Sequence, residues 1–461
     1  MSADAAAPRA ANPAAPPAAG QGAGVSAWRG PLLFAVMAAM LIAVGAFQSW
    51  NVALSILCLC LISAVMALGV NMAWGYAGLL NIGTMGFAAV GGVAAVLAAQ
   101  PPVPEAWAAG GPGLLGAALA LAATVAAVTL MRRRLARGPA RGVLTAVVVV
   151  AGYAATRRFF DPAVDAIESV DSATTGYLGG LGLPIAFGWL LGGVMAAGAA
   201  WLIGRVALGL RSDYFAIATL GISEIVLAIV KNEDWLARGV KNVTGLPRPA
   251  IVPYEVQLQE SADFVARAEA LGIDPAEASG IAVKLLYALL FAIVLGILLW
   301  LAERALASPW GRMMRAIRDN EAAAEAMGKD VTRRHRQTFV LGCAVVGIAG
   351  AMLVTYDGQL TPTSYNPLRF TFLIWVMVIV GGSGNNWGSV LGGFLIWFVW
   401  IQAEPAGLWL MSVLSAPLPE GSWLAGHLRD GAPHMRMVFM GAILLIVMRF
   451  APRGLIPERP R

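Results

Sequence analysis

Long apolar segments separated by short polar ones run along most of the chain. The candidate membrane spans are 31–47, 52–70, 73–98, 113–131, 142–156, 184–204, 213–230, 281–302, 337–356, 370–383, 387–403 and 435–450. A transmembrane helix needs about 20 apolar residues, and backbone polar groups must be paired inside lipid. The pattern therefore predicts an all-α fold, a polytopic transmembrane helical bundle of about 10–12 spans. Segments 142–156, 370–383 and 387–403 are short for a full crossing, and one of them could be re-entrant.

The composition agrees with a membrane protein. Hydrophobic residues make up 59% of the 461 positions and charged residues 13%, whereas soluble proteins carry about 25% charged residues. The 53 glycines suit helix packing in lipid, where small residues let backbones approach. The net charge of +6 is then expected in cytoplasmic loops and does not indicate nucleic-acid binding. Cys58, Cys60 and Cys343 lie in apolar segments, where ordinary packing is expected.

The basic residues predict the orientation of the spans. If the spans alternate from a cytoplasmic N-terminus, most of the basic residues fall inside: Arg132, Arg133, Arg134, Arg137, Arg141, Arg205, Arg211, the 303–336 segment, Arg449, Arg453, Arg459 and Arg461. This distribution follows the positive-inside rule, and Arg157 with Arg158 is the exception. We therefore expect both termini in the cytoplasm and loop 231–280 outside. Phe264, Val265, Ala268 and Leu271 predict an amphipathic surface helix in that loop, or a docking surface for an external partner.

The two ends of the chain differ from its middle. Residues 1–26 are rich in Ala, Pro and Gly, and we expect a disordered cytoplasmic tail. This stretch lacks a basic region followed directly by an apolar one, so segment 31–47 is predicted to be a retained first span and not a signal peptide. Residues 27–455 then form the transmembrane domain, and 456–461 form a second cytoplasmic tail.

Segment 303–336 carries the densest run of charge and lies between two spans. Ser308 and the following proline are typical of a helix start, and Gly328 is typical of a helix end. The sequence therefore predicts one capped cytoplasmic helix between them. This helix contains Glu321, Ala322 and Ala323, where small side chains beside one carboxylate can seat in a groove.

Glu321-Ala322-Ala323 followed by Gly328 resembles the coupling motif of ABC-importer permeases. Residues 75–83 with Phe87, residues 210–221 with Glu224, and the glycine turn 381–384 with Trp387 resemble further signatures of one family in the right order. From about 50 to 455 the chain is similar to the LivM-type permease family of branched-chain amino acid importers. It departs from that family at Gly91-Gly92-Val93, at Thr244-Gly245, at Ser389, and in region 131–180, which looks as if a helical pair had been inserted.

The resemblance implies a permease domain that imports branched-chain or hydrophobic amino acids across the bacterial inner membrane. It implies three partners: cytoplasmic ABC ATPase subunits that use the ATP, a second permease subunit that is a paralogue, and a periplasmic solute-binding protein. The ATPase-coupling residues carried over are Arg318, Glu321, Ala322, Ala323 and Gly328. The same scaffold could also carry urea, short amides or another small solute.

The residue pattern indicates no nucleotide-binding, metal-binding or catalytic site in this chain. Gly328-Lys329-Asp330 lacks the remainder of a phosphate-binding loop, and the histidines are not spaced as metal ligands: His335, His427 and His434. We therefore predict a transporter that is not an enzyme, with no metal and no cofactor bound by this chain. Energy must come from another subunit or, alternatively, from an ion gradient in a secondary transporter.

Polar residues inside two spans predict a substrate path: Asn81, Thr84, Thr219, Ser223 and Glu224. Glu224 is the main intramembrane carboxylate, and a charge at mid-bilayer costs roughly 2.5–3.5 kcal/mol. The carboxylate therefore faces water, a partner or a solute, or it snorkels to the outer interface. The neighbouring glycines either break the span to expose backbone groups or only let helices pack closely.

Overall fold

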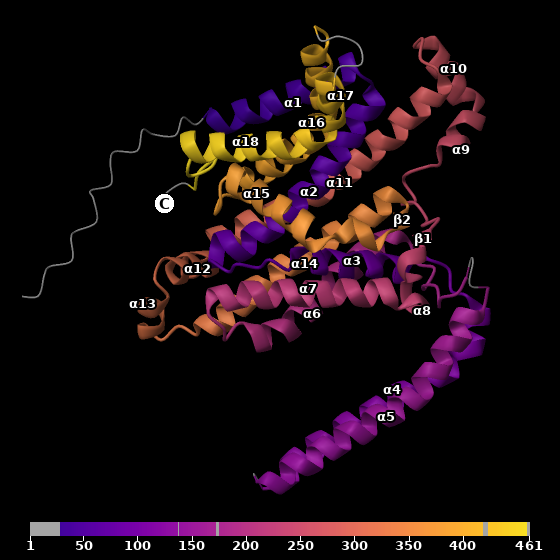
Figure 1. The fold of residues 1–461 in the computed structure, drawn as a ribbon, viewed down its shortest axis with the longest axis vertical. Coiled ribbons are helices and arrows are strands. Elements are labelled where there is room, and N and C mark those ends of the chain that lie inside the picture. The colour runs from indigo at the N-terminus through magenta and orange to yellow at the C-terminus, as the bar shows by residue number, and fades with distance from the viewer. Residues whose placement is uncertain (1–27, 137, 172–174, 418–422, 459–461) are drawn as a thin grey trace, which may run out of the picture.

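A computed structural model describes residues 28–136, 138–171, 175–417 and 423–458, and these form a bundle of helices (Figure 1). Nine helices in these described ranges are long and apolar enough to cross a membrane: α1 (Arg29–Phe47), α2 (Trp50–Ala77), α4 (Pro104–Arg134), α5 (Pro139–Ser169), α6 (Ile185–Ala207), α7 (Ser212–Asn232), α11 (Pro275–Ala307), α14 (Val331–Asp357) and α16 (Asn386–Ser415). The predicted all-α, polytopic transmembrane fold is confirmed. Residues 1–26 and 459–461, predicted as part of the two tails, lie outside the described residues.

Three shorter apolar helices complete the set: α3 (Thr84–Ala99), α15 (Phe372–Gly381) and α18 (Met435–Phe450). A five-residue π-helix, η3 (Pro367–Thr371), precedes α15. Each of the twelve predicted spans thus contributes to a helix, but two length estimates were wrong. The helices at 142–156 and 387–403 have 31 and 30 residues, because they continue past the charged residues that end each apolar run. In α5 the ion pair between Arg157 and Asp161, at 2.9 Å, accompanies this continuation.

Segment 73–98 is not the single span that its hydropathy predicts. Helix α2 ends at Ala77, Gly78 adopts a left-handed conformation with φ 70°, and α3 begins only at Thr84. The intervening backbone is non-helical, and Leu79, Asn81 and Gly83 within it are buried. The interruption shortens α3 to 16 residues.

Helices α2 and α14 form the centre of the bundle. The most apolar stretch of each is 72% buried, compared with 6% in α4 and α5. Glycines let the backbones of neighbouring helices approach, as small residues do in membrane bundles. A Cβ at Gly91 in α3 would meet the carbonyl oxygen of Gly347 in α14, and a Cβ at Gly350 would meet that of Ala88. These contacts fix the position of α3 against α14.

Helices α4 and α5 form a hairpin that projects from the bundle (Figure 1). The two helices pack mainly on each other, where Gly110 lies against Ile167 and Gly152 against Thr124. Only α5 lies within region 131–180, where a helical pair was expected, because its partner α4 begins at Pro104. The tip of the hairpin carries Arg132, so a basic group lies at the far end of two long apolar helices.

Short elements cover one end of the bundle: α8 (Asp234–Ala237), η1 (Gly239–Lys241), α9 (Glu255–Glu260), α10 (Ala262–Ala270) and η2 (Pro362–Tyr365). Strands β1 (Val243–Thr244) and β2 (Gln359–Leu360) pair antiparallel, with Val243 opposite Leu360. The predicted amphipathic helix is α10. Arg248 holds Glu255 at 2.8 Å; burial raises the pKa of this carboxyl, but the hydrogen bond and charge of Arg248 outweigh burial and lower it.

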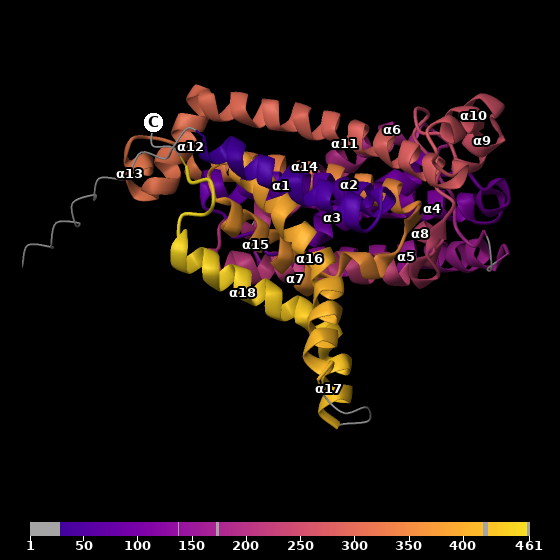
Figure 2. The same cartoon turned by 90° about the horizontal axis from the view of Figure 1, so that it is seen from above.

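The opposite end carries α12 (Pro309–Asp319) and α13 (Glu321–Ala326), as both views show (Figures 1 and 2). We call this end the α12 end, and the one with the strands the β2 end. Helices α17 (Trp423–Gly431) and η4 (Ala432–His434) lead into α18. The segment after α18 returns to the α12 end, where Ile456 lies near Gly30 at the start of α1.

Candidate functional site

The charged segment between α11 and α14 folds as two helices, and the prediction of a single helix is wrong. Ser308 begins α12, because its hydroxyl accepts a hydrogen bond from the Gly311 amide at 3.4 Å. Asn320 is extended and ends α12, and its side chain accepts a bond from the Ala323 amide at 2.9 Å that begins α13. Asparagine is a preferred N-cap residue, so a local signal for this break was present. Gly328 follows with φ 76°, as predicted.

The predicted coupling residues on α13 lie on the protein surface. Glu321, Ala322 and Ala323 are all exposed. The helix pair is attached to the bundle by α12, whose Met314 and Ile317 are buried with 0% and 1% of their surface exposed. A surface of small side chains beside one carboxylate is therefore presented outward on a firmly packed base.

Arg318 faces the bundle instead. Its guanidinium donates a hydrogen bond to the carbonyl of Gly75, near the end of α2, and pairs with the Glu458 carboxylate at 3.0 Å. This one side chain therefore connects α12 to a central helix and to the C-terminal segment. No local pattern indicated Glu458, because its contact with Arg318 joins segments far apart in the chain.

A buried polar network continues from this contact into the bundle. The Asn386 side-chain oxygen accepts hydrogen bonds from the Tyr76 hydroxyl and from Asn71 Nδ2, the latter at 3.1 Å. Asn386 Nδ2 donates to Glu303 at 3.0 Å, and Asn71 Oδ1 accepts from the Gly384 amide at 2.8 Å. Asn71 and Asn386 are fully buried. The network joins α2, α11, α16 and the glycine turn between α15 and α16, so a displacement of one element displaces the others.

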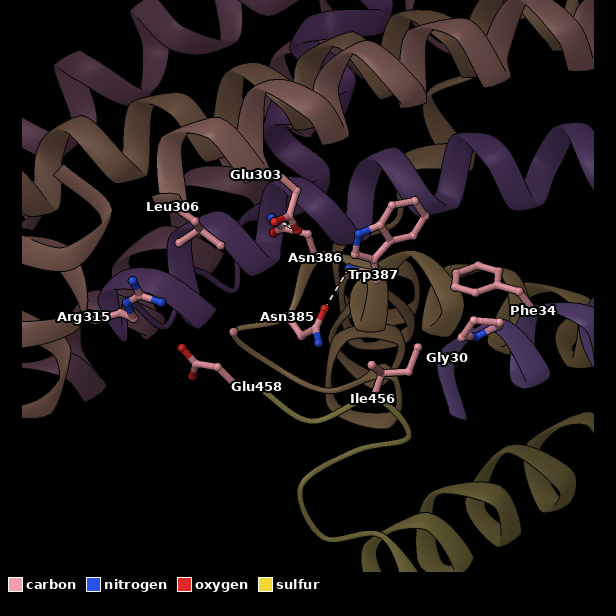
Figure 3. Close-up of a pocket in the computed structure, with 12 residues that line it drawn as sticks. Gly30, Phe34, Glu303, Leu306, Arg315, Asn385, Asn386, Trp387, Ile456 and Glu458 are labelled. Atoms are coloured by element: carbon pink, nitrogen blue, oxygen red, sulfur yellow. Dashed lines mark hydrogen bonds between the residues drawn. The ribbon is translucent and has the colours of Figure 1, made fainter. Parts of the chain in front are cut away.

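Charged cavities lie beside this network. One of about 600 Å³ is lined by Glu303, Arg315, Trp387 and Glu458, among others (Figure 3). A second, of about 1,000 Å³, shares Arg315 and Glu458 and extends past Arg318. Positively and negatively charged side chains face these cavities. This lining suits water and movement of α12 more than the binding of an apolar solute.

Asn81 organises the non-helical segment between α2 and α3. Its Oδ1 accepts a hydrogen bond from the Gly83 amide at 3.0 Å. Its carbonyl accepts one from the Trp375 indole at 3.0 Å and one from the Thr84 hydroxyl at 3.2 Å. Non-helical backbone at membrane depth is tolerated where it is buried in protein or lines a cavity. The break is therefore a built feature, held by side chains from α3 and α15.

Helix α7 packs directly on this break. The Ile82 amide donates to the Thr219 hydroxyl at 3.1 Å. A Cβ on Gly86 would lie 2.8 Å from the Ser223 hydroxyl oxygen, so α3 and α7 are in direct contact there. That hydroxyl is buried and has no hydrogen-bond partner among the described residues. Four of the five predicted path residues, all but Glu224, therefore lie together and are buried.

Glu224 lies on the other face of α7. It is exposed, as are Ile217, Gly221 and Ile225 on the same face. Its carboxylate makes no hydrogen bond or ion pair with any residue that the structure describes. The structure therefore does not bring Glu224 together with Asn81.

The predicted absence of a metal and of a cofactor stays a prediction. Within the described ranges, no three His, Cys, Asp or Glu side chains group as a metal site would require. The cysteines are buried and unpaired with one another, as expected from their apolar surroundings.

Comparison with known proteins gives one family. The model of the family described as branched-chain amino acid transport system, permease component, matches residues 170–448. The chain is similar to the high-affinity branched-chain amino acid transport system permease protein LivM of Escherichia coli, with 28% identity over 284 residues, 60% of this chain and 58% of the relative. The LivM protein of Salmonella typhimurium is 26% identical over 276 residues, 59% and 57% of the two chains.

A probable LivM protein of Methanocaldococcus jannaschii is 30% identical over 158 residues, 34% of this chain and 42% of the relative. The chain thus spans less than two thirds of the length of each of these curated relatives. No solved structure matches it. The family match runs from α6 to α18 and includes α12 and α13, whereas α2 and Glu458, which contact Arg318, lie outside it.

Proposed function

This chain belongs to the family of branched-chain amino acid transport permeases, and from that premise we propose that it is the transmembrane permease subunit of a binding-protein-dependent ABC importer. ATP hydrolysis on separate ATPase subunits drives the inward movement of branched-chain or other hydrophobic amino acids. The chain itself binds no cofactor. It lies in the bacterial inner membrane with the α12 end and both termini in the cytoplasm.

The arrangement of α12 and α13 carries this proposal. Residues 321–323 offer an exposed, small-residue surface for an ATPase subunit, and Arg318 joins the same helix pair to Gly75 and Glu458. Closure of the ATPase subunits would displace α12, and Arg318 would transmit that displacement to α2. The Asn386 network would carry it on to α11 and α16.

The other partners bind elsewhere on the molecule. The solute-binding protein docks at the β2 end, where α9 and α10 are largely exposed. The second permease subunit covers the face of α7 that carries Glu224. A carboxylate within the membrane is costly unless water, a partner or a solute faces it, and Gly221 on the same face leaves room for a close approach.

The break between α2 and α3 is the proposed substrate path within this chain. Asn81, Thr84, Thr219 and Ser223 line it, and discontinuous helices place backbone groups near substrates in other transporters. The break can also serve close packing alone. A change in transport selectivity in Asn81→Leu, without loss of protein from the membrane, distinguishes the two roles.

Uptake in cells tests the proposed function. Bacteria that lack their own branched-chain amino acid uptake would express this chain with its partner subunits, and uptake of radiolabelled leucine would be measured. We expect uptake in the parent. Glu321→Lys should abolish uptake and release the ATPase from the membrane, whereas Glu105→Lys, an equal charge change on exposed α4, should do neither. Uptake of urea or an amide but not of leucine would contradict the substrate, and normal uptake in Glu321→Lys would contradict the coupling.

A further inference from the structure

A third cavity lies within the bundle, away from the charged ones. We propose that this cavity of about 240 Å³ binds the branched aliphatic side chain of the transported amino acid. Helices α2, α14, α15 and α16 supply its walls, with Met85 from the start of α3. The inference rests on the proposed function, because it assigns that function a binding site within one subunit.

The lining selects an apolar solute of variable shape. Ile62 and Ile374 are among the aliphatic residues of the wall, and Met66, Met85 and Met377 also line it. Methionine is unbranched and flexible, so it adapts to ligands of slightly different shape. Leucine, isoleucine and valine differ in this way, whereas urea would leave its polar groups unpaired against such a wall.

The size of the cavity fits one small amino acid. It exceeds the roughly 150 Å³ of an engineered protein cavity that binds benzene. It is smaller than the roughly 300–1,000 Å³ typical of sites for drug-sized ligands. A single aliphatic amino acid is therefore a suitable occupant, and a peptide or a lipid is too large.

Two polar groups of the lining match the two charges of a free amino acid. Trp397 has a buried indole N–H with no acceptor among the described residues. Asp357, the last residue of α14, is exposed next to β2, so its carboxylate lies at the β2 end of the cavity. We assign the substrate ammonium group to Asp357 and the substrate carboxylate to the N–H of Trp397.

The cavity adjoins the break between α2 and α3. Met85 directly follows Thr84, and its amide donates to the Thr371 hydroxyl at 3.4 Å. Thr371 ends the π-helix η3, which supplies Phe370 to the cavity wall. Single π-helical turns are frequent at functional sites. A substrate that enters at Asp357 would thus reach the cavity first and the Asn81 segment afterwards.

A selectivity measurement tests this site. The complete importer, with its partner permease, ATPases and solute-binding protein, would be reconstituted in lipid vesicles. Initial uptake rates of L-leucine and L-valine would be measured in the same preparation, so that the amount of folded protein cancels from their ratio. Ser63→Leu fills the cavity and should lower the leucine-to-valine ratio about tenfold, the scale of one or two methylene groups in an apolar pocket.

Two controls match this variant. Ser412→Leu adds the same side chain on the exposed face of α16 and should leave the ratio unchanged. Met66→Ala enlarges the cavity and should raise the ratio, which keeps the test decisive if Ser63→Leu fails to fold. Asp357→Asn should lower the uptake of both amino acids, whereas Asp263→Asn on exposed α10 should not.

The outcomes separate this site from the proposed function. If the parent imports both amino acids and neither Ser63→Leu nor Met66→Ala changes the ratio by more than about twofold, the cavity is not the binding site and the proposed function stands. If the parent imports neither amino acid, the proposed function fails and the assignment of the cavity fails with it.

Discussion

Replacement of Asn386 by leucine should destabilise the protein strongly. The leucine has a similar size but removes the acceptor that, among the described residues, serves both the Tyr76 hydroxyl and Asn71 Nδ2. A buried polar group left without a partner costs about 1–3 kcal/mol, so these two groups together cost about 2–6 kcal/mol. Glu303 is only half-buried, so water can replace its bond from Asn386. The loss is a large part of a typical folding free energy of about 5–15 kcal/mol.

A double-mutant cycle measures whether the network acts as described. Unfolding of Asn386→Leu, Tyr76→Phe and the double variant would be followed in detergent, and their changes in unfolding free energy compared. Tyr76→Phe removes the hydroxyl that Asn386→Leu leaves unpaired, so the double variant should be more stable than the sum of the two changes predicts. We expect a coupling energy of about 0.5–3 kcal/mol, as for residues in one hydrogen-bond network.

The control for this cycle is Asn232→Leu. Asn232 is exposed at the end of α7, and among the described residues its side-chain amide donates to the carbonyl of Ala228 in the same helix at 2.7 Å. Its replacement should change the unfolding free energy by less than about 0.5 kcal/mol. Additive effects of the Asn386 and Tyr76 substitutions, or an effect of Asn386→Leu no larger than that of the control, would refute the network.

Three further predictions concern coupling, orientation and packing. Gly328→Val should reduce uptake and ATPase binding with normal membrane insertion, because φ 76° strains a β-branched residue by about 1–2 kcal/mol while no neighbour crowds it; full uptake would contradict this. In a cysteine-free background, Ala266→Cys should react with an impermeant thiol reagent in intact cells and Ala323→Cys only after permeabilisation, and the reverse would overturn the orientation. Gly91→Val should lower the yield of folded protein, whereas Gly198→Val, with open space around it, should not; equal yields would contradict the close α3–α14 contact.

The features predicted correctly from the sequence are those that local chemistry determines. Apolar length located the nine helices of the described residues that are long enough to cross a membrane, because lipid selects for it directly. The caps at Ser308 and Gly328 depend on a few neighbouring residues and were predicted in place. The cap at Asn320 is equally local, but the continuous run of helix-forming residues around it favoured a single helix.

The features that were missed depend on tertiary contacts. The segment after Ala77 is as apolar as a membrane-spanning helix, so its hydropathy does not indicate a break. The break is stabilised by hydrogen bonds to Trp375 and Thr219, which lie far away in the sequence. Glu458 pairs with Arg318 only because the C-terminal segment returns to the α12 end. The position of Glu224 within α7 was predictable, but the direction of its side chain was not, since either face of α7 fits the same hydropathy.

Transport by the purified importer is the most direct test of ATP-driven amino acid import through this permease. The chain and its partner subunits would be reconstituted in vesicles with ATP enclosed on the side of α12 and α13, and the accumulation of radiolabelled leucine would be measured. We predict accumulation that requires ATP hydrolysis and persists after ion gradients are collapsed. Accumulation that requires an ion gradient and no ATP would contradict the account.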